Sequence, residues 1–230
     1  MFQLVTEALL GSAPMKHTIL LKVWMSLSGL YLILFLVVHL LGNLQLFLPT
    51  ETARIWFNGY SAVLTKNPLI KVAGVLTYLS VLIHALTSWL LTKRNRSARA
   101  YAAEAANASS SWYSRRMGVL GLLLLVFLVF HMWDFWVPYQ FGPIDLDVDG
   151  RKDLYAVVLA SFSRPWVVAG YMLCMVALGY HLQHGFTAAF RSLGVHGARG
   201  GRILRGSAPL LAWIIAGGFA AMPLFTFLRS

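Results

Sequence analysis

Four histidines lie deep inside long apolar segments of the chain, where polar side chains are otherwise scarce. They are His39, His84, His131 and His181. An ionisable side chain within the hydrocarbon core of a membrane is costly, so such a residue usually has a partner and a function. A neutral imidazole is a strong axial ligand for haem iron, and two imidazoles on one iron leave no position for oxygen or substrate. We therefore expect these histidines to hold haems that pass single electrons.

Two of the histidines lie at one depth, measured from the basic residue that ends their apolar segment. At 1.5 Å per residue of helix, His84 lies about 13 Å from Lys93. By the same measure, His181 lies about 15 Å from Arg191. We expect these two histidines at the same level in the membrane, nearer the cytoplasm; this is the inner level.

The other two histidines share a second depth, measured from the basic residue that precedes their segment. His39 lies about 25 Å from Lys22 along the helix. His131 lies about 22 Å from Arg116. Four segments thus supply one histidine each, in two pairs about 10 Å apart along the membrane normal. Zinc is a weaker alternative, because no cysteine or carboxylate adjoins these histidines to complete a tetrahedral site.

A fifth histidine, His184, follows His181 within one helical turn, and we expect it to contact a haem propionate or a quinone, or only to pack. Small residues share the helical face of His181. These are Gly170, Cys174, Ala177, Gly185 and Ala188. Such a stripe is typical of close helix packing in membranes, but it would also leave room for a flat haem, and one helix does not decide between the two. His17 and His196 lie in basic segments and are expected to be solvated.

The composition is that of a polytopic membrane protein. Hydrophobic residues make up 58% of the chain and charged residues only 12%, which is too apolar for an ordinary soluble domain. The net charge of +11 does not indicate nucleic-acid binding, because basic residues gather on the cytoplasmic side of membrane proteins. The single cysteine, Cys174, excludes an iron–sulfur cluster and an intramolecular disulfide in this chain.

Five charge-poor windows approach or exceed the roughly 20 residues needed to cross a bilayer. The sequence therefore predicts a single all-α membrane domain over residues 1–230. The expected transmembrane helices are residues 20–47, 69–92, 117–137, 165–190 and 207–228. The first four would form a bundle around two stacked haems.

The connections between these windows differ in charge, which predicts their orientation. Lysine and arginine gather in residues 93–116 and 191–205, so these links are expected to face the cytoplasm. Residues 49–68 and 138–164 have fewer basic and more acidic residues and are expected to face outward. The N-terminus would then lie in the cytoplasm. The expected location of the protein is the inner membrane of a bacterial cell.

Polar and aromatic residues follow both outer histidines and form a candidate quinone site. Asp134, Trp133 and Trp136 come directly after His131. A carboxylate beside aromatic rings suits a quinone that exchanges protons on reduction. The same residues are equally typical of a solvated helix end and of an interfacial tryptophan belt. The other two candidate quinone residues are Asn43 and Gln45, which follow His39.

Taken together, the order and spacing of these motifs resemble a known family. The motifs are His39-Leu40-Leu41-Gly42-Asn43-Leu44, His84, Phe130-His131-Met132-Trp133, and His181-Leu182-Gln183-His184-Gly185 running on to Leu193-Gly194. From about Met15 to Leu228 the chain is similar to the membrane-anchor cytochrome b subunit of succinate:quinone oxidoreductases, in its single-subunit, five-helix form with two haems b.

The resemblance implies axial ligands, cofactors and partners. It pairs His84 with His181 on the inner haem and His39 with His131 on the outer haem, and it prefers His181 to His184 because the family ligand stands four residues before a glycine. Flavin adenine dinucleotide and iron–sulfur clusters would lie only in two partner subunits, a flavoprotein and an iron–sulfur protein. This chain would carry electrons from them to a quinone, such as menaquinone, in the surrounding lipid. The whole complex could form a higher oligomer.

One departure from the family and two rival functions bear on this interpretation. Some fumarate-reducing members carry a proton-conducting glutamate where this chain has Gly179, so the resemblance favours a succinate dehydrogenase over a fumarate reductase. Di-haem anchors of nitrate reductase or hydrogenase are an alternative, but they commonly place paired histidines on one helix. A haem-free transporter is the rival from another class, and it would be expected to have charged or broken helices at mid-membrane.

Overall fold

The computed structural model describes residues 15–99, 111–195 and 197–229, and these residues are almost entirely helical. The described ranges contain no strand, only an isolated bridge between Leu146 and Lys152. The long helices are α2 (Met15–Asn43), α4 (Pro68–Arg99), α7 (Met117–His131), α10 (Pro165–Ser192) and α11 (Ala198–Arg229). The all-helical class predicted from the sequence is confirmed.

Five helical stretches are long and apolar enough to cross a membrane, as the sequence predicts, and the chain has the architecture of a multi-pass membrane protein. A helix suits this role because it satisfies its own backbone hydrogen bonds where no water is present. The stretches are His17–Phe47, Pro68–Arg94, Met117–Phe141, Pro165–Ser192 and Gly200–Arg229. The third is continuous because α7 runs through a π-helical turn, η2 (Met132–Trp136), into α8 (Val137–Phe141).

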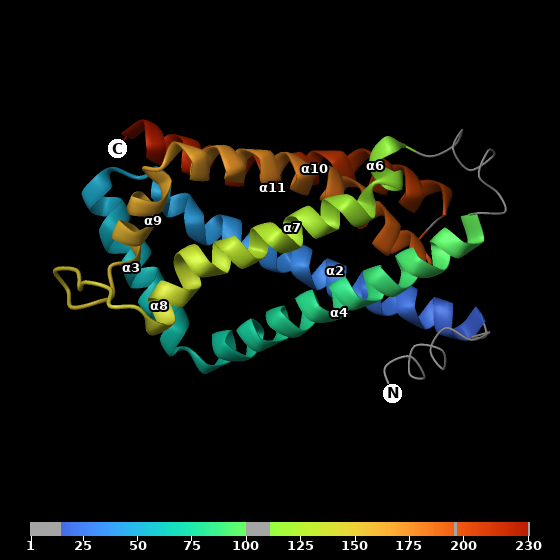
Figure 1. Ribbon diagram of the computed structural model, residues 1–230, viewed down its shortest axis with the longest axis horizontal. Helices are drawn as coiled ribbons and strands as arrows, with labels where there is room; N and C mark the ends of the chain where they lie inside the picture. Colours follow the sequence, from blue (N-terminus) through green and yellow to red (C-terminus); the bar gives the residue numbers. More distant parts are fainter. Residues whose placement is uncertain (1–14, 100–110, 196, 230) are drawn as a thin grey trace.

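The five long helices lie lengthwise, and short helices gather at the two ends (Figure 1). At one end are η1 (Leu44–Phe47), α3 (Thr50–Lys66) and α9 (Leu154–Phe162), which belong to the connections after α2 and α8. The four-residue helix α6 (Trp112–Arg115) lies at the other end. The first residue of α2 and the last residue of α11 lie at opposite ends of the bundle (Figure 1).

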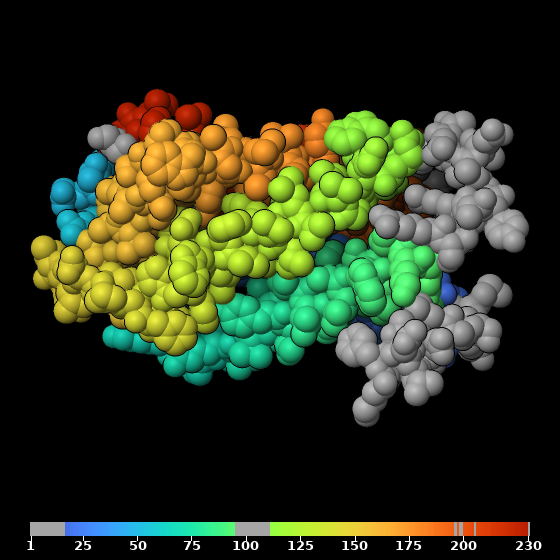
Figure 2. Space-filling model, viewed as in Figure 1, coloured from blue at the N-terminus to red at the C-terminus, as the bar shows by residue number. Residues whose placement is uncertain are grey.

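The apolar core lies between α2, α10 and α11 and extends to α3 and α9. Gly179 allows close packing of α10 on α11, because a Cβ at this position would lie 2.6 Å from a ring carbon of Trp213. By contrast, α4 and α7 lie on the face that Figure 2 shows, in teal and yellow-green. Their most apolar 18-residue windows contain no buried residue, whereas 44% of the corresponding α10 window is buried. Contacts with the rest of the chain therefore bury little of the side-chain surface of α4 and α7.

A buried polar network joins the connection after α2 to the connection after α8. Asn58 of α3 donates to a carboxylate oxygen of Asp153 at 2.8 Å and of Asp147 at 3.3 Å. Arg54 pairs with Asp153, and Arg151 pairs with Asp147 at 2.9 Å. Burial raises the pKa of both aspartates, but these hydrogen bonds outweigh it and hold both pKa values below the usual range. The network fixes α3 against α9 at one end of the bundle.

Candidate functional site: two pairs of histidines

The first pair is formed by His84 near the middle of α4 and His181 in the second half of α10. Their ring centres lie 6.1 Å apart, with an angle of 71° between the ring planes. Nearly a hundred residues separate the two positions in the sequence, so the pair is a product of the helix packing. The structure thus brings together the two histidines expected on the inner level.

The second pair is formed by His39, near the end of α2, and His131, the last residue of α7. Their ring centres lie 5.9 Å apart, and the ring planes are almost perpendicular at 88°. Aromatic rings surround the pair: Phe35 stacks on His39, and Phe219 of α11 lies 5.6 Å from the same imidazole. The two histidines expected on the outer level are therefore also neighbours, in an apolar environment.

The separation within each pair suits two imidazoles on opposite sides of one metal ion. A histidine nitrogen binds a metal at about 2 Å, and the ring centre lies about 1 Å further, so the centres of two opposed rings are about 6 Å apart. Among the residues that the structure describes, no three histidine, cysteine, aspartate or glutamate side chains come together as a metal site. A pair of imidazoles at this separation is compatible with an ion whose remaining ligands come from a macrocycle such as haem; the same separation and angle also occur in edge-to-face ring packing.

Hydrogen bonds to the inner pair involve only Nδ1. His84 Nδ1 lies 3.2 Å from the backbone carbonyl oxygen of Met25 and 3.4 Å from the hydroxyl oxygen of Ser28. Ser28 itself donates to the carbonyl of Trp24 at 2.8 Å. Since the carbonyl accepts from Nδ1–H of His84, Nε2 is left as the free donor atom for a metal. Nδ1 of His181 is buried and has no partner among the described residues.

The outer pair makes its hydrogen bonds through Nδ1 as well. His131 Nδ1 lies 3.2 Å from the hydroxyl oxygen of Tyr171 on α10. His39 Nδ1 lies 3.4 Å from the side-chain nitrogen of Asn43, which donates to the backbone carbonyl of His39 at 2.7 Å. No described residue makes a hydrogen bond to Nε2 of any of these four histidines. The side-chain nitrogen of Asn43 can only donate, so its contact with Nδ1 of His39 exists only in the tautomer that carries the proton on Nε2. Ligation through Nε2 of His39 therefore requires the proton to move to Nδ1 and this contact to be lost.

Contacts across the bundle place the two pairs ten residues apart along the helices. A Cβ added at Gly29 of α2 would lie 3.1 Å from His84, and one added at Gly121 of α7 would lie 3.5 Å from His181. Each of these inner-level glycines precedes the outer histidine of its own helix by ten residues. On α10 the order is reversed, because Tyr171, which contacts the outer pair, precedes His181 by ten. Ten residues of helix span about 15 Å, somewhat more than the spacing estimated from the charged boundaries.

His184 belongs to neither pair. Its ring lies 6.4 Å from that of Tyr113, at the end of the bundle that carries α6. His17 is exposed, and His196 lies outside the described residues.

The small-residue stripe beside His181 has two kinds of surroundings. Cys174 and Ala177 are buried by neighbouring side chains, as close helix packing requires. A Cβ added at Gly170 or Gly185 would meet nothing within 4 Å. Cys174 and Ala177 thus pack closely, whereas the two glycines of the stripe lie in open space, so both interpretations of the stripe retain support.

The candidate quinone residues that follow His131 point in three directions. Asp134 lies 3.6 Å from the guanidinium of Arg164 at the start of α10. Trp136 packs edge-on against Tyr78 of α4, with ring centres 6.2 Å apart. Trp133 is 68% exposed and lies on the outside of the bundle, as a belt tryptophan does.

The two candidate quinone residues that follow His39 lie on α2 and η1. The side-chain nitrogen of Asn43 donates to the backbone carbonyl of His39 and also lies near the Nδ1 atom of its ring. Gln45 donates from its side-chain nitrogen to the carbonyl of Gly42 at 2.9 Å, while its side-chain oxygen is buried and has no partner among the described residues. No hydrogen bond, ion pair or ring contact among the described residues joins Asn43 or Gln45 to Asp134, Trp133 or Trp136. The structure does not bring these five side chains together in one cluster.

Sequence reasoning missed two features next to His131. One is the π-helical turn η2, in which Val137 N–H bonds to the carbonyl of Met132, five residues earlier. The other is Tyr171, the hydrogen-bond partner of His131. The sequence does contain a signal for Tyr171, because it lies at the depth of the outer pair on α10. Turns of the η2 type recur at functional sites, but no residue pattern in the sequence marks this one.

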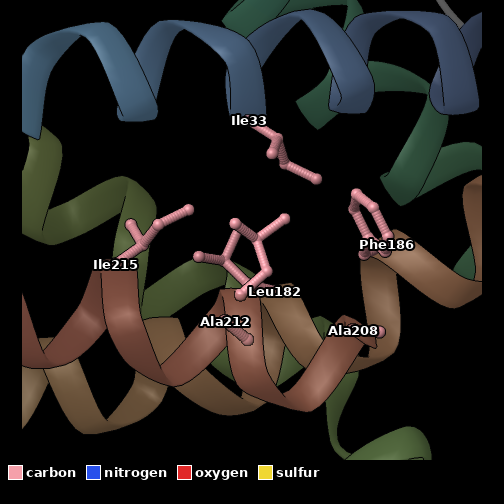
Figure 3. A pocket seen from close by; sticks show the side chains of 7 residues that line it. Ile33, Leu182, Phe186, Ala208, Ala212 and Ile215 are labelled. Atoms are coloured by element: carbon pink, nitrogen blue, oxygen red, sulfur yellow. The ribbon is translucent and has the colours of Figure 1, made fainter. Parts of the chain in front are cut away.

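A small apolar hollow lies between α2, α10 and α11 (Figure 3). Its walls include Ile33, Leu182, Phe186 and Ile215, and it has no room for even a single water molecule. Ligand pockets usually exceed about 300 Å³ and contain some polar groups. This hollow has neither property, so it is a packing gap and not a quinone site.

Comparisons with protein-family models, with curated proteins and with solved structures find no match to this chain. The functional interpretation therefore rests on the geometry of the two histidine pairs and on the sequence motifs.

Proposed function

We propose that this chain is the di-haem cytochrome b anchor of a succinate:quinone oxidoreductase. The observation that carries the proposal is the presence of two imidazole pairs, each with ring centres about 6 Å apart, contributed by four membrane-spanning helices. His84 and His181 hold the inner haem, and His39 and His131 hold the outer haem. The resemblance of the sequence motifs supports the succinate-linked assignment.

The protein's own residues orient the imidazoles and keep the site free of other ligands. The carbonyl of Met25 fixes the tautomer of His84 by accepting from Nδ1, which directs Nε2 to the metal. Gly29 and Gly121 leave space for the inner imidazoles. A b-type haem bound between two imidazoles supplies reversible one-electron transfer and has no open coordination position.

In the proposed complex, electrons flow from the basic end of the bundle to the outer end. Electrons enter at the end of the bundle with the basic links 93–116 and 191–205, where the iron–sulfur and flavoprotein subunits dock. The inner and outer pairs, about 15 Å apart along the helices, would hold the haems that supply one-electron transfer between the two ends. A quinone accepts the electrons at the outer end. Two separate candidate contacts are Gln45, whose buried side-chain oxygen has no donor among the described residues, and Asp134, which lies beside Arg164.

The rival functions fit the arrangement less well. Anchors of nitrate reductase or hydrogenase commonly carry paired histidines on one helix, whereas here the four paired histidines lie on four different helices. A transporter is expected to have charged or broken helices at mid-membrane, and here Asp134 lies toward the end of its span and is already paired with Arg164. A fumarate reductase uses the same chain in the opposite direction of electron flow, and Gly179 favours succinate oxidation.

The test is purification of the full chain from its native membrane together with its bound subunits. We expect succinate to reduce both haem components and to drive reduction of a menaquinone analogue. His131→Ala should abolish quinone reduction, and His17→Ala, at an exposed position, should leave it unchanged. Absence of haem would exclude the cytochrome assignment. Haem that is reduced by hydrogen or by a quinol but not by succinate would retain the cytochrome and exclude the succinate-linked complex.

A further inference from the structure

We infer that Tyr171 is a positioning residue of the outer pair, which accepts a hydrogen bond from Nδ1 of His131 and thereby sets the orientation and the donor strength of that imidazole. The inference rests on the proposed function, because it concerns His131 as a haem ligand. It adds a residue on α10 to an outer site whose proposed ligands come from α2 and α7.

The geometry places one polar atom of Tyr171 on one polar atom of His131. Tyr171 is 8% exposed, and its hydroxyl oxygen lies 3.2 Å from Nδ1 of His131. No other hydrogen bond to this hydroxyl occurs among the described residues. A buried tyrosine hydroxyl normally has a partner, and His131 is the partner here.

Aromatic neighbours hold the Tyr171 ring in place. Its centre lies 4.8 Å from that of Phe127, 5.1 Å from that of Phe162 and 6.3 Å from that of Phe135. All three contacts are edge-to-face, with interplanar angles of 79°, 80° and 85°, which is a favoured arrangement of aromatic rings. The packing therefore fixes the direction of the hydroxyl group before any ligand binds.

The direction of the hydrogen bond follows from the role of the imidazole. When Nε2 of a neutral histidine binds a metal, Nδ1 carries the proton and donates it. The tyrosine oxygen is then the acceptor. An acceptor at this position increases the electron density on the ligand nitrogen, which favours the oxidised over the reduced metal. Removing the oxygen should therefore raise the reduction potential of the outer haem.

Asp134 does not take this role, although it lies only three residues after His131. Its carboxylate pairs with Arg164, and no hydrogen bond joins it to the imidazole. Among the described residues, Tyr171 is thus the side chain that makes a hydrogen bond to Nδ1 of His131. Because Tyr171 does not touch the inner pair, a change at this position can influence the outer pair alone. The inner pair has its own acceptor, the carbonyl of Met25.

The test is the Tyr171→Phe variant of the full chain, studied by redox titration with optical and electron paramagnetic resonance detection. The substitution removes one oxygen and leaves the ring contacts intact. We expect both haems to be retained, the potential of the outer component to rise by about 59 mV, equivalent to a tenfold change for one electron, and its low-spin resonance to shift. The inner component should not change.

The matched control is Tyr180→Phe, on the same helix. The Tyr180 ring packs on Trp112, Tyr113 and Trp213, and no hydrogen bond of its hydroxyl occurs among the described residues, so neither haem component should shift. An unchanged outer component in Tyr171→Phe, or an equal change in both components, would overturn the role of Tyr171. Absence of haem from the unaltered chain would instead reject the proposed function itself.

Discussion

The Nδ1 atoms of the four histidines have unequal surroundings, and the two pairs are therefore not equivalent. His84 has a backbone carbonyl as acceptor, His131 has a phenol, and His181 has no partner among the described residues. Because the acceptor on Nδ1 influences the ligand strength of Nε2, we expect two haems with distinct potentials. Distinct potentials are useful in a protein that carries electrons in sequence from one site to the next.

Gly29 provides a residue-level test of the inner pair. A Cβ at this position would lie 3.1 Å from His84, so Gly29→Leu should push the imidazole away from His181. We expect loss of the inner spectral component with retention of the outer one, measured by reduced-minus-oxidised difference spectra. The control is Gly217→Leu on α11, where a Cβ would meet nothing within 4 Å. Retention of both components in Gly29→Leu would show that the ring is not held as described.

The close contact between Gly179 and Trp213 limits which side chains this position can accommodate. A Cβ there would lie 2.6 Å from a ring carbon of Trp213, a side chain that is 38% exposed. A glutamate at this position would therefore require the Trp213 ring to move.

At the scale of the elements, the π-helical turn η2 determines the course of the chain after His131. The turn adds a residue relative to a regular helix, which changes the directions of the side chains after it. Phe135 packs against His131 with ring centres 5.2 Å apart, and Asp134 reaches Arg164 of α10. The helix continues into α8 beyond the turn, so the third span is complete although Pro138 lies within it.

The contact of α3 with α9 depends on one buried amide. Asn58→Ala would leave the carboxylates of Asp147 and Asp153 with one donor fewer each, and loss of a buried partner costs about 1–3 kcal/mol. We expect a lower thermal midpoint for the variant in detergent at pH 7. The control is Thr65→Ala, at an exposed position on the same helix, whose effect should stay within about 0.5 kcal/mol. Equal midpoints for Asn58→Ala and the unaltered chain would contradict the network.

The same network predicts how stability depends on pH. The pKa values of Asp147 and Asp153 are lowered in the folded chain, since hydrogen bonds outweigh the effect of burial. Their stabilising contribution is therefore present above the unfolded value of about 3.9 and is lost as the pH falls through the folded values. The difference between Asn58→Ala and the unaltered chain should accordingly be full at pH 7 and should shrink below about pH 4.

At the scale of the whole molecule, much of the architecture follows from the positions of charged residues. The all-helical class and five long apolar helices are confirmed, because charges are expelled from membrane spans whatever the details of packing. The hydrogen-bond partners of Asn58 and of His131 could not be predicted from the positions of charged residues. Both depend on contacts between residues far apart in the sequence, and one sequence contains no direct record of such contacts. Haem ligation and orientation stay predictions.

The orientation can be tested with single cysteines, because Cys174 is buried and is the chain's one cysteine. In a Cys174→Ala background, Val148→Cys and Val195→Cys place thiols at positions that are 91% and 43% exposed. We expect a membrane-impermeant thiol reagent to label position 148 on intact cells. Position 195 should be labelled only in inverted vesicles, since the basic links are expected to face the cytoplasm. The reverse labelling pattern would contradict the orientation.

The most direct test of the central claim is a count of haem in the purified full chain by the pyridine haemochrome method. We predict two haems b per chain, and one after His84 and His181 are both changed to alanine. The remaining component should then be the one that disappears when His39 and His131 are changed instead. A chain that binds no haem, or loses both components from either double variant alone, would contradict two independent histidine pairs.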